Sequence, residues 1–157
     1  MEGGIKKNNL INMMELENIL SYYGGFLDGE GYIGIKKKKY KNNKFDPSYS
    51  ERVSVAGINK LSICGFNDLM VGNILEHKPS KLGNVPCWSW EVTNNKAKNF
   101  LKMIRPYLKL KGLDADLVLA LSKNKEKTNR RRVPKEDRDL RENLYIILKT
   151  LHTRKKI

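Results

Sequence analysis

Leu20-Ser-Tyr-Tyr-Gly-Gly-Phe-Leu-Asp-Gly-Glu-Gly-Tyr32 is the stretch that decides the fold. From Met13 onward, apolar residues recur every three or four positions, which predicts a helix that ends in Asp28-Gly-Glu-Gly31. Gly25 and Gly29 lie one turn apart, a spacing that favours close packing of another backbone. A simpler reading makes Gly29 and Gly31 left-handed helix caps. The acidic pair runs directly into a lysine-rich strand, which suggests a metal ion held against a phosphate backbone.

The net charge of the chain indicates a nucleic-acid partner. Lys and Arg number 31 against 17 Asp and Glu, a formal charge of +14 on 157 residues. Each phosphate that a Lys or Arg neutralises releases condensed counterions, so an excess of this size is typical of nucleic-acid-binding proteins. A merely basic, soluble surface is the alternative on charge alone.

Several protein classes are disfavoured by what the chain lacks. Cys64 and Cys87 lie far apart, and only His77 and His152 could join them, so a structural zinc site is not expected and nothing demands an oxidising compartment. No apolar run reaches the roughly 18 residues of a membrane span, and the N-terminus lacks the apolar region of a signal peptide. We expect an intracellular protein with no membrane partner, in the cytoplasm of an archaeon or in an organelle matrix or stroma.

The element order predicts an α+β fold. Residues 1–12 read as a flexible tail, and residues 13–157 read as one domain with C-terminal helices. Strands are expected at 32–43 and 49–58, and a second strand pair with a turn near Gly83 leads through 87–92. Helices are expected at 60–76, 95–108, 113–121 and 135–153, with a charged linker at 122–134. This αββαββα order predicts a mixed or antiparallel saddle-shaped sheet covered by helices on one face.

Strand parity predicts which side chains leave the covered face. Ile33 and Ile35 mark that face in the first strand, Val53 and Val55 mark it in the second, and Trp90 looks like core in the last. The alternate positions form a surface that fits a major groove of double-stranded DNA. Alternatively, the lysines only protect an exposed edge strand from pairing with another chain. The expected DNA-binding residues are Lys36, Lys38, Tyr40, Asn42, Ser50, Arg52, Ser54, Lys81, Ser89 and Glu91.

The acidic motif suits metal-assisted phosphodiester hydrolysis. Glu30 lies at a helix C-terminus, where the helix dipole disfavours a carboxylate unless a cation is present, and the Gly29 carbonyl adds a hard oxygen ligand for Mg²⁺. Mn²⁺ would be another possible cofactor, and Ca²⁺ would bind without supporting turnover. One carboxylate per chain is too few for a two-metal clamp, so a homodimer packed through Gly25 and Gly29 is predicted. Taken alone, the four residues Asp28-Gly-Glu-Gly31 also fit an ordinary acidic turn.

Two blocks of sequence resemble the LAGLIDADG homing endonucleases. Tyr23-Gly-Gly-Phe-Leu-Asp-Gly-Glu-Gly31 is similar to the signature motif of that family, and Pro106-Tyr-Leu-Lys-Leu-Lys111 is similar to its later basic motif. The resemblance covers roughly residues 16–122. One motif in a chain of this length resembles the homodimeric branch of the family.

The resemblance implies roles for individual residues. Glu30 would be the metal-binding acid, a position where the family also uses Asp, with the Gly29 carbonyl beside it. Asn59 would organise active-site water, although it also fits a turn former. Lys111 would lie near the scissile phosphate, although it also fits a helix-boundary lysine. A further basic residue that some relatives carry after the second strand is not evident, since Leu61-Ser-Ile63 occupies that region.

The implied activity is hydrolysis of both strands of a long pseudo-palindromic DNA site, with cuts across a minor groove and intron or intein homing as the purpose. An RNA maturase that binds intron RNA and assists splicing is the main alternative, and a non-cleaving DNA-binding regulator is another. Other nuclease classes fit poorly, because Gly31-Tyr-Ile-Gly34 is only half of a GIY-YIG signature and two scattered histidines do not suit an HNH site.

Overall fold

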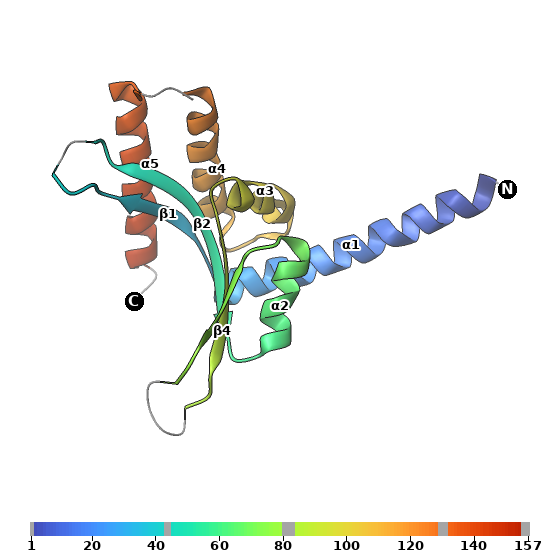
Figure 1. Ribbon diagram of the computed structural model, residues 1–157. Coiled ribbons are helices and arrows are strands. Elements are labelled where there is room, and N and C mark those ends of the chain that lie inside the picture. The colour runs from blue at the N-terminus through green and yellow to red at the C-terminus, as the bar shows by residue number, and fades with distance from the viewer. Residues whose placement is uncertain (1, 43–44, 80–83, 129–131, 155–157) are drawn as a thin grey trace.

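The α+β architecture is confirmed by a computed structural model (Figure 1). The structure describes residues 2–42, 45–79, 84–128 and 132–154, with side chains described from residue 12 to residue 153 of these ranges. The elements are α1 (Glu2–Glu30), β1 (Gly31–Lys38), β2 (Ser48–Gly57), α2 (Lys60–Leu69), β3 (Asn73–His77), β4 (Cys87–Thr93), α3 (Asn94–Ile104), the 3₁₀ turn η1 (Arg105–Tyr107), α4 (Gly112–Lys127) and α5 (Lys135–Arg154). The sheet has the order β1-β2-β4-β3, and all neighbouring strands pair antiparallel.

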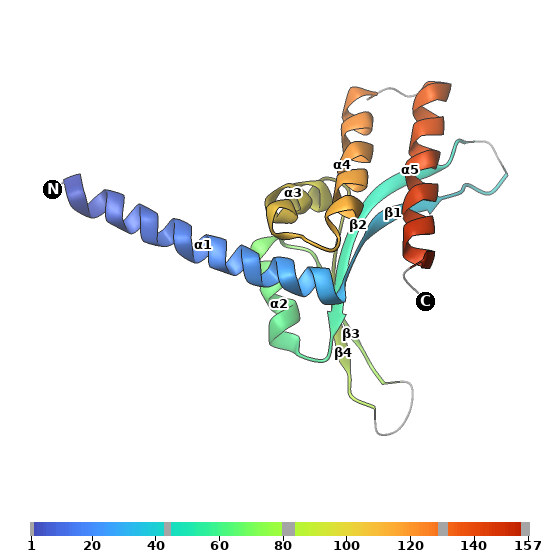
Figure 2. The same cartoon turned by 180° about the vertical axis from the view of Figure 1, so that it is seen from behind.

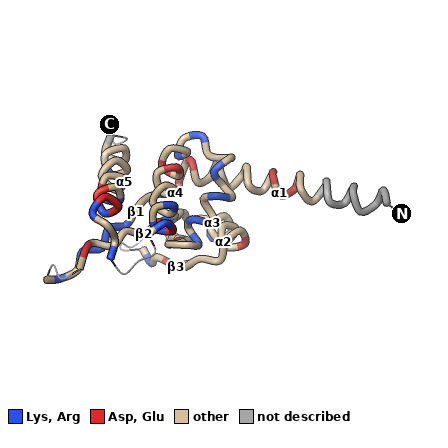
Figure 3. Tube along the Cα trace, turned by 90° about the horizontal axis from the view of Figure 1, so that it is seen from above, with Lys and Arg blue, Asp and Glu red and all other residues tan. Residues whose placement is uncertain are grey.

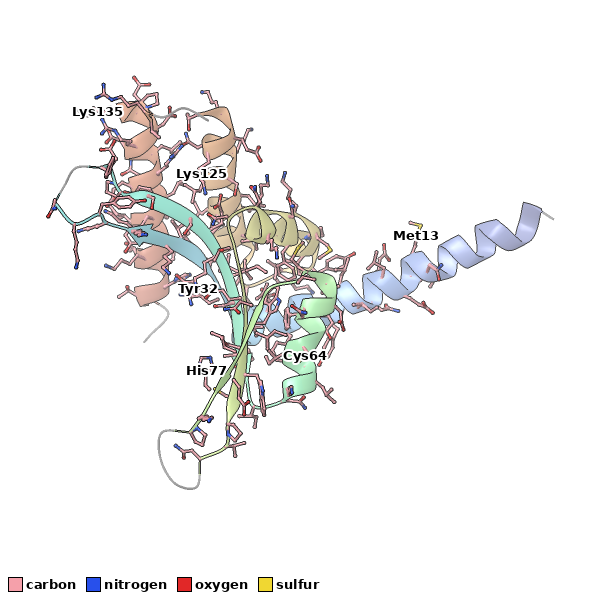
Figure 4. The ribbon with its side chains drawn as sticks, viewed as in Figure 1. Met13, Tyr32, Cys64, His77, Lys125 and Lys135 are labelled. Carbon is pink, nitrogen blue, oxygen red and sulfur yellow. The ribbon has the colours of Figure 1, made fainter. Side chains whose placement is uncertain are left out.

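Helix α1 is longer than the hydrophobic spacing predicts. It begins at Glu2 rather than at Met13 and projects away from the rest of the molecule (Figure 1). Met13 lies on this projecting part with 62% of its surface exposed (Figure 4). The expected boundary after residue 12 therefore does not coincide with a break in secondary structure. Polar residues early in the chain hide the helix from a search for apolar periodicity, because a solvent-exposed helix needs no apolar stripe.

The core lies between the sheet and the helices that cover one of its faces (Figure 2). Ile33, Val53 and Trp90 are fully buried on that face, as strand parity predicts. Trp90 packs against Phe66 from α2 and Phe100 from α3, with ring centroids 5.3 and 5.0 Å away. Aromatic packing of this kind is worth more than its buried area alone. The helices are thereby fixed to one face, and the opposite face stays open.

Helix α2 ends seven residues before its predicted end, so Ile74, which the expected helix 60–76 included, lies in β3 instead. The Trp90 indole N–H donates to the Met70 carbonyl at 3.1 Å, and the Gly72 N–H donates to Asn67 Oδ1 at 2.9 Å. A Cβ atom at position 72 would lie 2.6 Å from the Glu91 carbonyl oxygen. These contacts turn the chain into β3, where Ile74 pairs with Trp90.

The first strand and the fourth helix also differ from the expected ranges. β1 ends at Lys38, and Tyr40 and Asn42 lie in the connection to β2. Asn42 adopts a φ of 81°, a left-handed conformation that Asn tolerates and a continuing strand does not contain. α4 continues to Lys127, six residues beyond its predicted end, so it takes in part of the expected linker. No described helix is long and apolar enough to cross a membrane.

Candidate active site and nucleic-acid interface

The acidic end of α1 is joined to the loop before α4 by the Asp28 side chain. Its carboxylate accepts hydrogen bonds from the backbone N–H groups of Lys109, Leu110 and Lys111 at 2.6, 3.1 and 3.0 Å. The Lys111 ammonium group donates in return to the Asp28 backbone carbonyl. The two sequence blocks that resemble the homing-endonuclease motifs are therefore bonded to each other, although 83 residues separate Asp28 from Lys111.

The pKa of Asp28 lies below the ordinary value of an Asp side chain, and two opposing effects set it. Burial, which leaves 9% of the residue exposed, by itself raises this pKa. The three backbone N–H groups and the charge of Lys111 lower it by more, because they stabilise the ionised carboxylate. Asp28 is therefore an ionised, structural acid. Its own side chain is fully engaged in holding the loop.

Glu30 has the opposite environment. It is the last residue of α1, two positions after Asp28, and its side chain is exposed. Gly29 is exposed as well, and a Cβ atom placed on it would meet no other atom within 4 Å. The Lys111 ammonium group is bonded to Asp28, the residue before Gly29. Gly29 and Glu30 therefore lie at the end of α1, next in sequence to the residue that binds Lys111.

These residues fit a hard divalent cation only in part. The Glu30 carboxylate and the Gly29 carbonyl are oxygen donors, the type that Mg²⁺ prefers. Within residues 12–153 that the structure describes, no cluster of three or more His, Cys, Asp or Glu side chains could hold a metal ion. The sharing of metal ligands between two chains stays a prediction.

Asn59 is held by a different contact. It is the N-cap of α2, where its side-chain oxygen accepts a hydrogen bond from the Ser62 backbone N–H at 3.1 Å. Capping satisfies one of the unpaired N–H groups of the first helical turn. The structure therefore gives Asn59 the turn-forming role that was the alternative, and a role in organising water remains a prediction.

The glycines of α1 fall into two groups. A Cβ atom on Gly24 would lie 2.6 Å from Tyr107 Cβ, so Gly24 is required where η1 packs on α1 within the chain. Gly25 and Gly29 instead face open space. Neither Gly29 nor Gly31 has a left-handed φ, so the reading as left-handed caps is wrong. An exposed glycine surface remains that a second helix could approach closely.

The open face of the sheet contains most of the predicted DNA-binding residues. The register pairs Lys36 with Ser50 and Ser54 with Glu91, which places their side chains on one face. Arg52 lies on the same face, where it forms a 2.6 Å ion pair with Glu91. Figure 3 shows Lys and Arg positions gathered around β1, β2 and the first turns of α5. Lys81 lies outside the described residues, and Tyr40 and Asn42 lie beyond β1.

Sequence reasoning missed other residues of this face. Tyr32 lies on β1 with the Arg52 guanidinium 5.6 Å from its ring centroid, and His77 on β3 lies 2.8 Å from the Ser89 hydroxyl (Figure 4). Tyr32 has the same parity as Gly34 and Lys36, so the alternation could have identified it. His77 was not identified because the expected helix, residues 60–76, took in the rest of β3.

Solved structures share this fold. The archaeal intron-encoded homing endonuclease I-Vdi141I, complexed with DNA, matches 85% of this chain and 84% of its own with a TM-score of 0.68 and 14% identity. I-CvuI in complex with its target matches 88% of this chain and 98% of its own with a TM-score of 0.62 and 17% identity. The LAGLIDADG homing endonuclease I-SmaMI, bound to cleaved DNA, matches 80% of this chain and 42% of its own with a TM-score of 0.62 and 16% identity.

Sequence comparisons add nothing to this likeness, since no protein-family model and no curated protein matches the chain. Identities of 14 to 17% establish a common fold rather than a common activity. The β-saddle, its covering helices and the glycine-bearing α1 all agree with that fold. The protein therefore has the LAGLIDADG homing-endonuclease fold that its two sequence blocks imply.

Proposed function

We propose that this protein is a site-specific double-strand DNA endonuclease that acts as a homodimer with a divalent cation. The observation that carries the proposal is the bond between the Lys111 ammonium group and the Asp28 carbonyl. It holds a cation at the Asp28 carbonyl, two residues before the exposed Glu30 at the end of α1. In phosphodiester hydrolysis a carboxylate can hold a metal ion and an ammonium group can face the phosphate.

The chemistry assigns one task to each group. A divalent cation, when bound by the Glu30 carboxylate and the Gly29 carbonyl, supplies an activated water and offsets charge on the leaving oxygen. The Lys111 ammonium group attracts the scissile phosphate and favours the negative charge that develops there. Asp28 does not contact substrate in this arrangement. It positions Lys111 by fixing the backbone of residues 109–111.

A homodimer would complete the site. Gly25 and Gly29 leave space on α1, so a two-fold axis along this surface could bring two Glu30 side chains together. The relatives support a DNA substrate and a divalent ion, because I-CvuI is seen in complex with DNA in the presence of Mg or of Ca. Homing of an intron or intein, in an archaeal cytoplasm or an organelle, is the biological setting we propose.

Cleavage of a randomised double-stranded DNA library with Mg²⁺ tests the proposed function. The wild-type protein should cut one long site, and Glu30→Gln should cut it at least ~10³-fold more slowly, because a metal ligand contributes several kcal/mol to the transition state. Glu17→Gln is the matched control, since Glu17 is also exposed on α1 but lies far from the motif. Binding without cleavage by the wild-type protein would refute the enzyme and favour a regulator or a maturase.

The homodimer has a separate test. Gly25→Leu should leave the folded chain intact, because a side chain at this position meets open space, but it should convert a dimer to a monomer. Gly24→Leu is the contrast, since a side chain there would collide with Tyr107 and unfold the junction. Sedimentation equilibrium and circular dichroism measure the two effects. A Gly25→Leu protein that remains dimeric would show that the interface lies elsewhere.

A further inference from the structure

The C-terminal end of α5 is bonded to the first turn of α4. His152 Nε2 lies 3.0 Å from Asp114 Oδ2, although 38 residues separate the two in sequence. Asp114 is buried, with 2% of the residue exposed, and it lies in the first turn of its helix. The helix dipole favours a carboxylate at this position, and a carboxylate removed from water requires hydrogen-bond donors. The His152 ring supplies such a donor.

The start of α4 also carries Lys111. Lys111 is the N-cap of the helix, and its carbonyl accepts the Ala115 N–H at 3.0 Å. A lysine side chain has no acceptor atom, so it cannot cap the unpaired N–H groups of the first helical turn. Contacts with other elements hold this turn instead. Asp28 binds the N–H groups of residues 109–111 from α1, and His152 binds the first turn from α5.

The same histidine contacts β1. Its ring centroid lies 5.3 Å from that of Tyr32, in an edge-to-face arrangement at 60°. Tyr32 stands two residues after Glu30, because α1 passes into β1 without an intervening loop. Figure 2 shows α5 beside both α4 and β1. His152 therefore joins the turn that carries Lys111 to the strand that follows Glu30.

Cations also lie around His152, which raises the alternative of a direct contact with phosphate. His152 lines a cavity of about 440 Å³ together with the cations Lys36, Lys37, Arg52 and Lys149. Its Nε2 atom, however, is engaged by Asp114, and 26% of the side chain is exposed. A ring nitrogen bonded to a buried carboxylate favours a role within the protein over a role at its surface.

We propose that His152 is a positioning residue for DNA cleavage. Through Asp114 and Tyr32 it fixes the start of α4 against β1, and it thereby sets the position of the Lys111 ammonium group. The inference rests on the proposed endonuclease function. It adds a residue of the C-terminal helix that touches neither the DNA nor the metal ion.

Two substitutions separate the hydrogen bond from the volume of the ring. His152→Leu keeps an apolar side chain of moderate size but has no donor. His152→Gln places an amide N–H group near the position of Nε2 and can keep the bond to Asp114. Thr150→Ala is the matched control on α5, since the exposed Thr150 hydroxyl donates to the Ile146 carbonyl of the same helix.

The first measurement is amide hydrogen exchange of the free protein, which needs no DNA. In His152→Leu, the amides of residues 109–111 and of Ala115 should exchange about tenfold faster than in the wild-type protein, as expected for the loss of one hydrogen bond. The amides that pair β2 with β4 report global unfolding and should change less. His152→Gln and Thr150→Ala should exchange as the wild-type protein does. Unchanged exchange at the start of α4 in His152→Leu would overturn the inference, whether or not the protein cuts DNA.

The second measurement is single-turnover cleavage of the site selected from the DNA library, at a temperature well below the melting point of every variant. His152→Leu should cut about tenfold more slowly, with an unchanged dissociation constant for the same duplex in Ca²⁺, and His152→Gln should recover most of the rate. A merely structural histidine would lower the melting temperature without slowing cleavage by the folded protein, and that result would refute the positioning role. Weaker duplex binding by both variants would show instead that His152 contacts phosphate.

Failure of the proposed function gives a different result. A wild-type protein that cuts no site would refute the endonuclease, and with it any role of His152 in cleavage. An active wild-type protein with an equally fast His152→Leu variant would refute the positioning role alone.

Discussion

Lys36 and Lys37 are adjacent in β1, yet they belong to two regions with different electrostatics. Lys37 points to the covered face, where its ammonium group lies 2.6 Å from Glu142 of α5 with only 15% of the side chain exposed. Lys36 points to the open face, where the described chain provides no acidic partner. The alternation of a strand thus separates two identical side chains into two functions.

The same difference extends over both faces. On the covered face, two acids are matched: the buried Glu51 bonds Ser122 and Lys125, and the half-buried Glu142 bonds Lys37 and Tyr49. The bonds from Lys37 and Tyr49 lower the pKa of Glu142, and burial together with the bond to Glu142 raises the pKa of Tyr49. On the open face, Arg52 pairs with Glu91, but no ion pair is found in the described chain for Lys36 or Lys38. Charges on the covered face therefore contribute to stability, and charges on the open face are available for binding.

The largest effect in this comparison is expected from Asp28→Ala. It leaves three backbone N–H groups of residues 109–111 without their acceptor, which should lower the free energy of unfolding by about 3 kcal/mol. Cleavage should fall as well, because Lys111 loses its position. Urea denaturation measures the first effect. Asp116→Ala, which breaks an exposed pair with Arg105, is the control and should cost less than about 1 kcal/mol.

Acid should remove the same stabilisation in the wild-type protein. The pKa of Asp28 is lower in the folded state than its ordinary value, so its contribution is present above about pH 4 and is lost as pH falls through the folded pKa. Asp28→Asn lacks this titration. The difference in unfolding free energy between the two proteins should therefore shrink as the pH falls below about 4. A constant difference across that range would show that Asp28 is not ionised in the folded protein.

A smaller loss is expected from Lys37→Gln. It removes two hydrogen bonds to the Glu142 carboxylate, at 2.6 and 2.8 Å, and should lower the free energy of unfolding by about 1 to 2 kcal/mol. The salt dependence of DNA binding should not change. Thermal melting tests the first expectation, and the slope of log K against log salt for binding to duplex DNA tests the second. A reduced slope would show that Lys37 reaches the DNA after all.

The smallest effect on the fold is expected from Lys36→Gln, the variant to be compared with Lys37→Gln. The melting temperature should stay at the wild-type value, because the side chain is exposed and makes no ion pair in the described chain. The salt slope of binding should fall by about 1, as for one lost phosphate contact. If Lys36→Gln lowers the melting temperature and Lys37→Gln does not, the assignment of the two faces is reversed.

Much of this organisation could be predicted from residues close in sequence. Ile33 and Ile35 alternate with Gly34 and Lys36, and a period of two residues assigns the faces of β1 without any knowledge of its neighbours. The glycine surface at Gly25 and Gly29 follows from helical spacing. The boundary of α2 could not be predicted, because it depends on Trp90, which lies 20 residues beyond Met70 and takes its carbonyl as an acceptor.

The sequence by itself determined the αββαββα order, the faces of the first hairpin and the excess of positive charge, since each depends on local periodicity or on composition. Only the tertiary structure decided that Asp28 and Glu30 have different roles, although they stand two residues apart. One carboxylate turns into the chain and accepts three backbone N–H bonds, and the other stays exposed. The donors come from residues 109–111, and no local pattern can show which distant backbone a side chain will meet.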